Sequence, residues 1–315
     1  MKIRKMGVVL GIFAAAMLLA PAALPAEAES LEEQGTLMPP SDNSEEQGMI
    51  GQPSSLEESV FTHSEPSQET ISWNPDWNYA SFSQIHSGSA VLYHAGGGNG
   101  ITVCVNAGHG TSGGSNVQTM CHPDGTPKVT GGSTAEGSVY AIAISSGATM
   151  ADGTSEAAVN LRIALILKEK LLAEGFDVLM IRETDDVQLD NIARTVMANN
   201  NADCHIALHY DSTASDKGFF CIGVPDVASY RAMEPVASHW QEHMALAQSI
   251  VNGQSTVGSR LCGNGIMDLD LTQTSYSTIP SVDVECGDTV SDCSPEMQGR
   301  IADGIVAGIR AYFGL

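Results

Sequence analysis

From about Asn99 onward, segments with strand character alternate with segments of helical periodicity. A short β-branched run occupies 101–106, and further strand-like runs occupy 176–181, 204–208, 219–222 and 282–284. Segments with helical periodicity occupy 155–173, 189–200, 236–251 and 295–312. Strands separated by helices predict a mainly parallel sheet with helices on both faces. We therefore expect a single α/β domain over residues 99–315.

Four polar residues stand at the ends of these segments. His109 and His209 each follow a predicted strand, Glu285 ends the last strand, and Glu156 lies in the first turn of the first long helix. Because ligands bind at the carboxyl ends of the strands in open α/β sheets, we expect these side chains to gather at one edge. Two imidazoles and a carboxylate suit a zinc ion that keeps one position open for water, and a second carboxylate can take that water's proton. The combination predicts a metal-dependent hydrolase.

Each of these residues also has a simpler interpretation on its own. Gly108-His109-Gly110 could be a tight turn, and Glu156 could complement the helix dipole behind an N-cap at Thr154 or Ser155. His209 could be a histidine satisfied at a strand end, and Glu285 could pair with an arginine. The hydrolase hypothesis depends on their joint placement at one sheet edge.

The N-terminal region differs in composition from the rest of the chain. Residues 1–28 combine Lys2, Arg4 and Lys5 with an uncharged run and a small-x-small pattern at 26–28, which predicts a secretory signal peptide; an uncleaved membrane anchor is the alternative. Residues 29–98 are acidic and poor in aliphatic side chains, and we expect them to form a disordered spacer. The protein is therefore predicted to be secreted to the cell wall, with membrane attachment only if the N-terminal segment stays uncleaved.

The charge distribution excludes one class of partner. No Lys or Arg occurs between Lys5 and Lys128, and the formal net charge is −23. A chain with no basic patch has nothing to neutralise phosphates, so we expect no nucleic acid to bind.

Among the seven cysteines, we expect Cys104, Cys204 and Cys286 to be buried in strands. Four others fall in loops or at strand edges and are the better disulfide candidates, namely Cys121, Cys221, Cys262 and Cys293. Their pairing cannot be deduced.

Four histidines and two arginines outside the candidate site are expected to have other roles. His205 is expected to be a packed side chain, His122 to lie on the surface, and the pair His239 and His243 to lie on a solvated helix face, because the H-E-x-x-H glutamate is missing. Arg182 and Arg194 are expected to be structural.

The chain from about residue 102 to the C-terminus resembles the zinc-dependent N-acetylmuramoyl-L-alanine amidases of bacterial cell-wall turnover. The matching segments, which agree in order and spacing, are V-C-V-N-A-G-H-G at 103–110, S-E-A-A-V-N-L at 155–161, R-E-T-D-D-V-Q-L-D-N-I-A-R at 182–194, A-N-N-N-A-D-C-H-I-A-L-H-Y-D-S at 198–212 and I-P-S-V-D-V-E-C-G at 279–287.

The resemblance implies a zinc site in which His109, Glu156 and His209 hold the metal and Glu285 is the catalytic carboxylate. It also implies a twisted sheet of about six strands with flanking helices. The implied reaction is hydrolysis of the amide bond between the lactyl group of N-acetylmuramic acid and L-alanine, with peptidoglycan as substrate.

This chain departs from the family pattern at two places. The family commonly has Ala-Asn-Ala after its second histidine, where Tyr210-Asp211-Ser212 stands here, and an apolar residue where Asp288 stands here. We expect Tyr210, Asp211 and Asp288 to line or border the cleft.

Two other functions remain open from the sequence: a zinc peptidase that cuts within the stem peptide, and a wall-binding module without turnover. No internal repeat or separate wall-binding domain is visible. Targeting would then depend on the catalytic cleft, the spacer or an unidentified protein partner, for example an activator.

Overall fold

The computed structural model of the protein describes residues 67–315. The predicted signal peptide at 1–28 and the spacer residues 29–66 lie outside the described residues.

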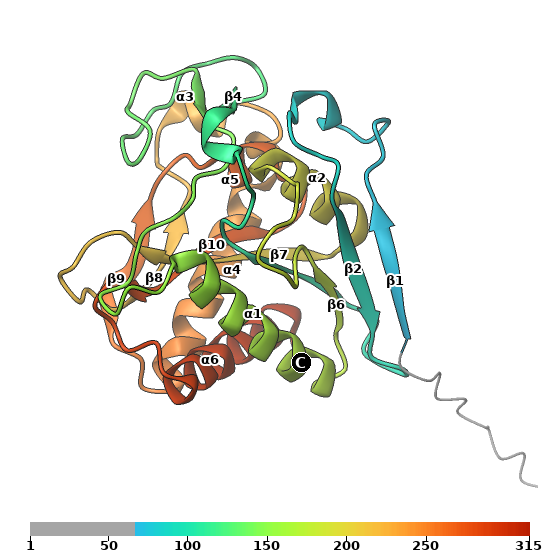
Figure 1. Ribbon diagram of the computed structural model, residues 1–315, viewed down its shortest axis with the longest axis vertical. Coiled ribbons are helices and arrows are strands. Elements are labelled where there is room, and N and C mark those ends of the chain that lie inside the picture. Colours follow the sequence, from blue (N-terminus) through green and yellow to red (C-terminus); the bar gives the residue numbers. More distant parts are fainter. Residues whose placement is uncertain (1–66) are drawn as a thin grey trace, which may run out of the picture. The chain divides into compact units, whose positions relative to one another are not determined.

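An eight-stranded sheet forms the centre of the described region, with the strand order β1-β2-β6-β3-β7-β10-β8-β9 (Figure 1). The four strands β6, β3, β7 and β10 are neighbours and run parallel, whereas β2 and β8 flank them in antiparallel pairing. The strands are β1 (Ser67–Ser72), β2 (Ser89–His94), β3 (Thr102–Ala107), β6 (Asp177–Met180), β7 (Cys204–Asp211), β8 (Phe219–Gly223), β9 (Leu261–Asp268) and β10 (Ser281–Asp288).

Helices cover both faces of this sheet, which confirms the predicted α/β fold. Alternate residues of the central strands point to opposite faces, so Val103 and Val105 pack in one apolar cluster and Cys104 in the other. The first cluster joins the sheet to α1 (Glu156–Ala173), α4 (Val236–Thr256) and α6 (Pro295–Phe313). On the other face lies α2 (Asn191–Asn201), next to the short helices α5 (Thr272–Tyr276) and η1 (Ala80–Phe82).

Side-chain caps determine where three of the long helices begin. Ser155, Asp190 and Ser294 each accept a hydrogen bond from a backbone N–H in the first turn of α1, α2 and α6. Gly175 follows α1 with a positive φ, a conformation that other residues rarely adopt. These caps explain why the predicted helix boundaries agree with the structure within a few residues.

The predicted disordered spacer is wrong over residues 67–98. Strands β1 and β2 pair with each other and β2 pairs with β6, so this segment adds two strands to the sheet edge. Ala90 and Leu92 alternate inward and are buried against the second apolar cluster, with Trp73 and Trp77 packed beside them. A few well-placed apolar side chains were enough for ordering, although the segment is mostly polar.

A long excursion between β3 and α1 carries its own two-stranded sheet, formed by β4 (Gln118–Met120) and β5 (Tyr140–Ile142) after the 3-10 turn η2 (Gly114–Asn116). The short helix α3 (Ala228–Arg231) precedes α4. None of the helices described in residues 67–315 is both long and apolar enough to cross a membrane.

Candidate metal centre

His109 lies in a strained loop immediately after β3. Its φ is +63°, in the left-handed region that residues other than glycine rarely adopt. The preceding Gly108 has no room for a side chain, because a Cβ atom there would lie 2.2 Å from Cε1 of His209. Strain of this kind concentrates at functional sites and persists only when the surroundings hold it.

Two arginines hold the loop in this conformation. Arg194 donates to the carbonyl oxygens of Ala107 (2.9 Å) and His109 (2.6 Å), and Arg182 donates to those of Ala107 (2.9 Å) and Gly108 (2.8 Å). Both guanidinium groups are buried, and burial lowers their pKa, for Arg182 to about 10 and for Arg194 to about 9. The expected structural role of Arg182 and Arg194 is consistent with these contacts.

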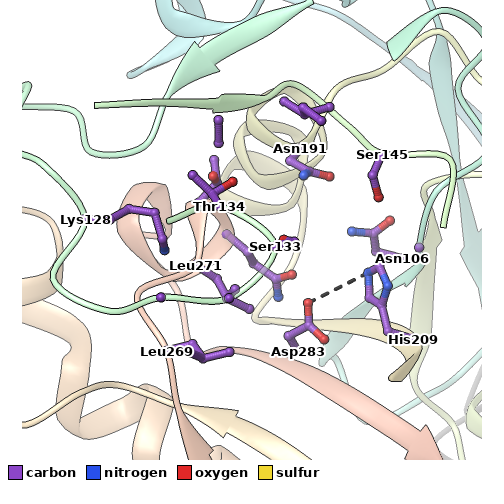
Figure 2. Close-up of a pocket in the computed structure, with 17 residues that line it drawn as sticks. Asn106, Lys128, Ser133, Thr134, Ser145, Asn191, His209, Leu269, Leu271 and Asp283 are labelled. Atoms are coloured by element: carbon purple, nitrogen blue, oxygen red, sulfur yellow. Dashed lines mark ion pairs between the residues drawn. The ribbon is translucent and has the colours of Figure 1, made fainter. Parts of the chain in front are cut away.

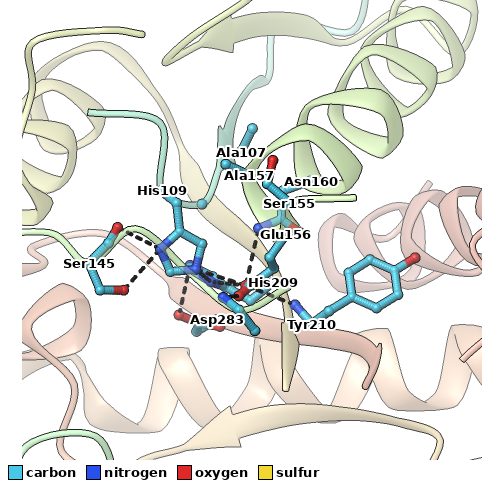
Figure 3. Close-up of polar contacts among 12 residues, drawn as sticks. Ala107, His109, Ser145, Ser155, Glu156, Ala157, Asn160, His209, Tyr210 and Asp283 are labelled. Atoms are coloured by element: carbon cyan, nitrogen blue, oxygen red, sulfur yellow. Dashed lines mark hydrogen bonds and ion pairs between the residues drawn. The ribbon is translucent and has the colours of Figure 1, made fainter. Parts of the chain in front are cut away.

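Glu156 is the first residue of α1 and is buried. Its Oε1 lies 2.8 Å from Nε2 of His109 and 3.1 Å from Nδ1 of His209, and it also accepts from the backbone N–H of Tyr210 at 3.2 Å. Its Oε2 accepts from the N–H of Ala148 at 2.7 Å. The carboxylate is thus fixed from both sides, and Oε1 faces the two imidazoles (Figure 3).

His209 lies near the end of β7 and completes the cluster. Its Nδ1 is 3.1 Å from Nε2 of His109, and the two rings meet edge to face, with centroids 4.6 Å apart. Within the described residues, His109, Glu156 and His209 form a group that could hold a metal ion, with one ligand atom from each and all of these atoms within 4.8 Å of one another.

The neighbours of Glu156 favour its negatively charged form, and the neighbours of His209 favour its positively charged form. Burial alone would raise the pKa of Glu156, but the hydrogen bonds with His109 and His209 lower it far below its ordinary value. Burial alone would lower the pKa of His209, but Asp283 and Glu156 outweigh it and raise the value to about 10. A cation is therefore strongly stabilised at this point.

Glu285 lies beside the group on the neighbouring strand. Parallel pairing of β10 with β7 sets Glu285 opposite His209 and Asp283 opposite Ala207. Val282 and Val284 face the apolar core, so Asp283 and Glu285 share the opposite face of the strand. Oε2 of Glu285 is buried without a hydrogen-bond partner, and burial, with Asp283 next in importance, raises its pKa well above the ordinary range.

A cavity of about 180 Å³ adjoins this face (Figure 2). His209 and Asp283 lie on one side of it, and the excursion between β3 and α1 supplies another wall through residues 131–134, Ala141 and Ile142. Room for a ligand thus lies next to the metal-binding group.

The structure differs from several other expectations. Tyr210 points into the apolar core, and Asp288 accepts from the N–H groups of Ser215 and Lys217, so neither lines this cavity as expected. Asp211 pairs with Lys217 and does not line this cavity, but its charge lies near Glu285, so it borders the site as expected.

Two of the other histidines are more buried than expected, while His205 is fully buried as predicted. His122 is buried and pairs with Asp270, with 3.1 Å between Nε2 and Oδ2. His243 accepts from the N–H of Ser281 at 3.0 Å and is also buried. The expected surface position of His122 and the expected solvated face of His243 are both wrong, because segments that are remote in sequence pack over these side chains.

All seven cysteines lie in the described region and are free thiols. Cys104, Cys204 and Cys286 are buried as predicted, but the four disulfide candidates are unpaired. Cys121 follows β4 directly and is buried, whereas Cys221 lies inside β8 and Cys262 inside β9, not in loops.

Sequence reasoning did not single out Asp283, Ser145 or Gly147. Asp283 precedes Glu285 by two residues, and the period of two along a strand would have placed both on one face. Ser145 contacts His109 through its carbonyl oxygen, 2.9 Å from Nδ1, and a Cβ atom on Gly147 would lie 2.6 Å from the same ring. Both belong to the excursion, whose path the sequence does not predict.

Comparisons with known proteins agree with this geometry. Residues 103–311 match the family described as N-acetylmuramoyl-L-alanine amidase. No curated protein sequence gives a significant match.

Two solved structures have a similar fold. An N-acetylmuramyl-L-alanine amidase from Mycobacterium smegmatis is 21% identical and has a TM-score of 0.56, covering 68% of this chain and 97% of its own. The apo form of the amidase from Mycobacterium abscessus is 22% identical and has a TM-score of 0.54, covering 68% of this chain and 99% of its own.

Proposed function

The chain belongs to the N-acetylmuramoyl-L-alanine amidase family, and from that premise we propose that it cleaves peptidoglycan with a zinc ion held by His109, Glu156 and His209. The bond hydrolysed is the amide between the lactyl group of N-acetylmuramic acid and L-alanine, so the products are the glycan and the free stem peptide. Glu285 carries the proton in this proposal.

The observation that supports zinc is the convergence of three ligand atoms from three separate elements. Nε2 of His109, Oε1 of Glu156 and Nδ1 of His209 lie 2.8 to 3.1 Å apart in pairs. Two imidazoles and one carboxylate form the donor set of catalytic zinc sites that leave a fourth position open. The donor set fits zinc better than magnesium or calcium, which prefer oxygen ligands alone.

Zinc in such a site acidifies a water molecule and polarises the scissile carbonyl. The side chains of the chain have to move the remaining proton. Glu285 stands opposite His209 on the next strand, with a buried carboxylate oxygen that no protein group engages. It is therefore available to a water molecule and to a leaving nitrogen.

The proton balance assigns Glu285 two steps. As general base it takes a proton from the attacking water, while a C–O bond forms at the lactyl carbonyl. As general acid it gives that proton to the alanine nitrogen when the C–N bond breaks. The lactyl group is released as a carboxylic acid, and the stem peptide is the leaving group and departs as an amine. Glu285 returns to its starting protonation state.

We also propose that the chain is exported and acts in the cell wall. This proposal relies on the basic, apolar and small-residue pattern of residues 1–28. Detection of a mature N-terminus near residue 29 in the extracellular fraction would test it.

Digestion of purified sacculi by the full chain tests the reaction. We expect intact stem peptides and peptide-free glycan by mass spectrometry, and no release after a chelator removes the metal. Glu285→Gln should keep zinc and lose about 100-fold to 10,000-fold in turnover. Glu183→Gln, which alters a carboxylate paired with Lys168, is the control and should retain turnover. Free amino acids in place of intact peptides would contradict the proposed bond and indicate a peptidase.

A further inference from the structure

Asp283 is a buried carboxylate that the proposed reaction does not use. Only 9% of the surface of Asp283 is exposed, and its Oδ1 atom is buried without a hydrogen-bond partner. It lies on β10 between Val282 and Val284, in the middle of the sheet. A carboxylate in such a place costs several kcal/mol unless an opposite charge or a donor compensates it.

The group that faces Asp283 is the ring of His209. Oδ2 of Asp283 lies 3.8 Å from Nε2 of His209, within ion-pair distance, and Figure 2 shows the two side chains facing each other. This ring nitrogen is the one that points away from His109 and Glu156, because Nδ1 faces those two residues.

The tautomer of His209 follows from this arrangement. A neutral imidazole that offers the lone pair of Nδ1 to a metal carries its proton on Nε2. That proton then points toward Asp283. Carboxylates in this position fix the orientation of a metal-binding histidine and increase its basicity.

His109 has a corresponding partner, which makes the arrangement consistent across the site. Its Nε2 faces the metal position, and its Nδ1 lies 2.9 Å from the carbonyl oxygen of Ser145. The first histidine is thus oriented by a backbone carbonyl group, whereas the second faces the carboxyl group of Asp283.

We propose that Asp283 is the positioning residue that orients His209 for metal binding. This inference rests on the proposed zinc site. Asp283 touches neither the substrate nor the reacting atoms in this role, and it acts through the imidazole of His209.

Zinc affinity of the full chain, measured by competition with a chelating dye, tests the proposal. Asp283→Ala should weaken zinc binding about 10-fold to 100-fold, as expected for loss of such a partner. Asp283→Asn keeps an oxygen that can face Nε2 of His209 but removes the charge, so its affinity should lie between wild type and Asp283→Ala. The visible spectrum of the cobalt-substituted protein should change in Asp283→Ala, because the ligand ring loses its orientation.

Asp211→Asn is the matched control, because it removes the same charge near Glu285 from a residue that pairs with Lys217. Its zinc affinity should stay within twofold of wild type. Equal zinc affinity in wild type and both Asp283 variants would overturn the proposal, whether or not their thermal stability falls. A rise in KM with unchanged zinc affinity would also overturn it and indicate direct substrate contact. Failure of the wild-type chain to bind zinc would instead refute the proposed function.

Discussion

Acid should destabilise this protein through two buried histidines, His205 on β7 and His243 on α4. Neither ring nitrogen of His205 has a hydrogen-bond partner, and Nε2 of His243 has none. Burial lowers the pKa of both rings to about 3, with smaller contributions from Arg194 and His243 at His205 and from His239 at His243. Both rings are therefore neutral in the folded protein at all moderate pH values.

The sign and the size of the effect follow from proton linkage. In the unfolded chain these histidines have a pKa of about 6.5, so below that pH the unfolded state binds more protons than the folded state. Stability is complete above pH 6.5 and is lost as the pH falls below it, down to about pH 3. Between pH 7 and pH 5 each histidine should reduce the free energy of unfolding by about 2 kcal/mol.

Urea unfolding monitored by circular dichroism at pH 7, 6 and 5 measures this loss. His243→Asn removes one titrating ring and keeps an oxygen that accepts from the N–H of Ser281, as Nδ1 of His243 does at 3.0 Å. The loss from pH 7 to pH 5 should be about 2 kcal/mol smaller in the variant, since all other groups cancel in the comparison. The same pH dependence in wild type and variant would refute the reasoning.

Two further predictions concern the metal site and the sheet edge. Gly147→Ala should weaken zinc binding at least about tenfold, because a Cβ atom there would lie 2.6 Å from the His109 ring. The control is Gly153→Ala, a glycine that also has a positive φ but has open space around it, and this change should cost only about 1 kcal/mol of stability. Equal zinc affinity in the two variants would contradict this prediction. A chain that begins at Asn99 lacks β1 and β2 and uncovers the apolar cluster beside β6. Its midpoint of thermal unfolding should therefore lie at least about 5 °C below that of the full chain. An unchanged unfolding midpoint would show that the two edge strands do not stabilise the domain.

The central part of the fold could be predicted from the sequence because its signals are local. The apolar runs of β3, β6, β7 and β10 lie within the strands that they predict, and the caps at Ser155, Asp190 and Ser294 stand directly before their helices. The placement of His109, Glu156, His209 and Glu285 near one another could also be expected from the sequence, because the ends of parallel strands meet at one edge of a sheet.

What the sequence did not predict depends on contacts between remote segments. β2 is ordered only because β6 and the second apolar cluster accept Ala90 and Leu92. β9 is interrupted by Gly263 and Gly265, both with positive φ, so its strand character is hidden in what reads as a glycine-rich connection. His122 is buried because Asp270, 148 residues later in the chain, reaches it.

The central claim is a zinc ion bound by two imidazoles and one carboxylate, and X-ray absorption at the zinc edge of the full chain tests it most directly. We expect nitrogen and oxygen ligands at about 2.0 to 2.2 Å with outer-shell scattering from two imidazole rings. Sulfur at about 2.3 Å, or a signal from fewer than two imidazoles, would contradict the assignment of His109, Glu156 and His209 as the metal ligands.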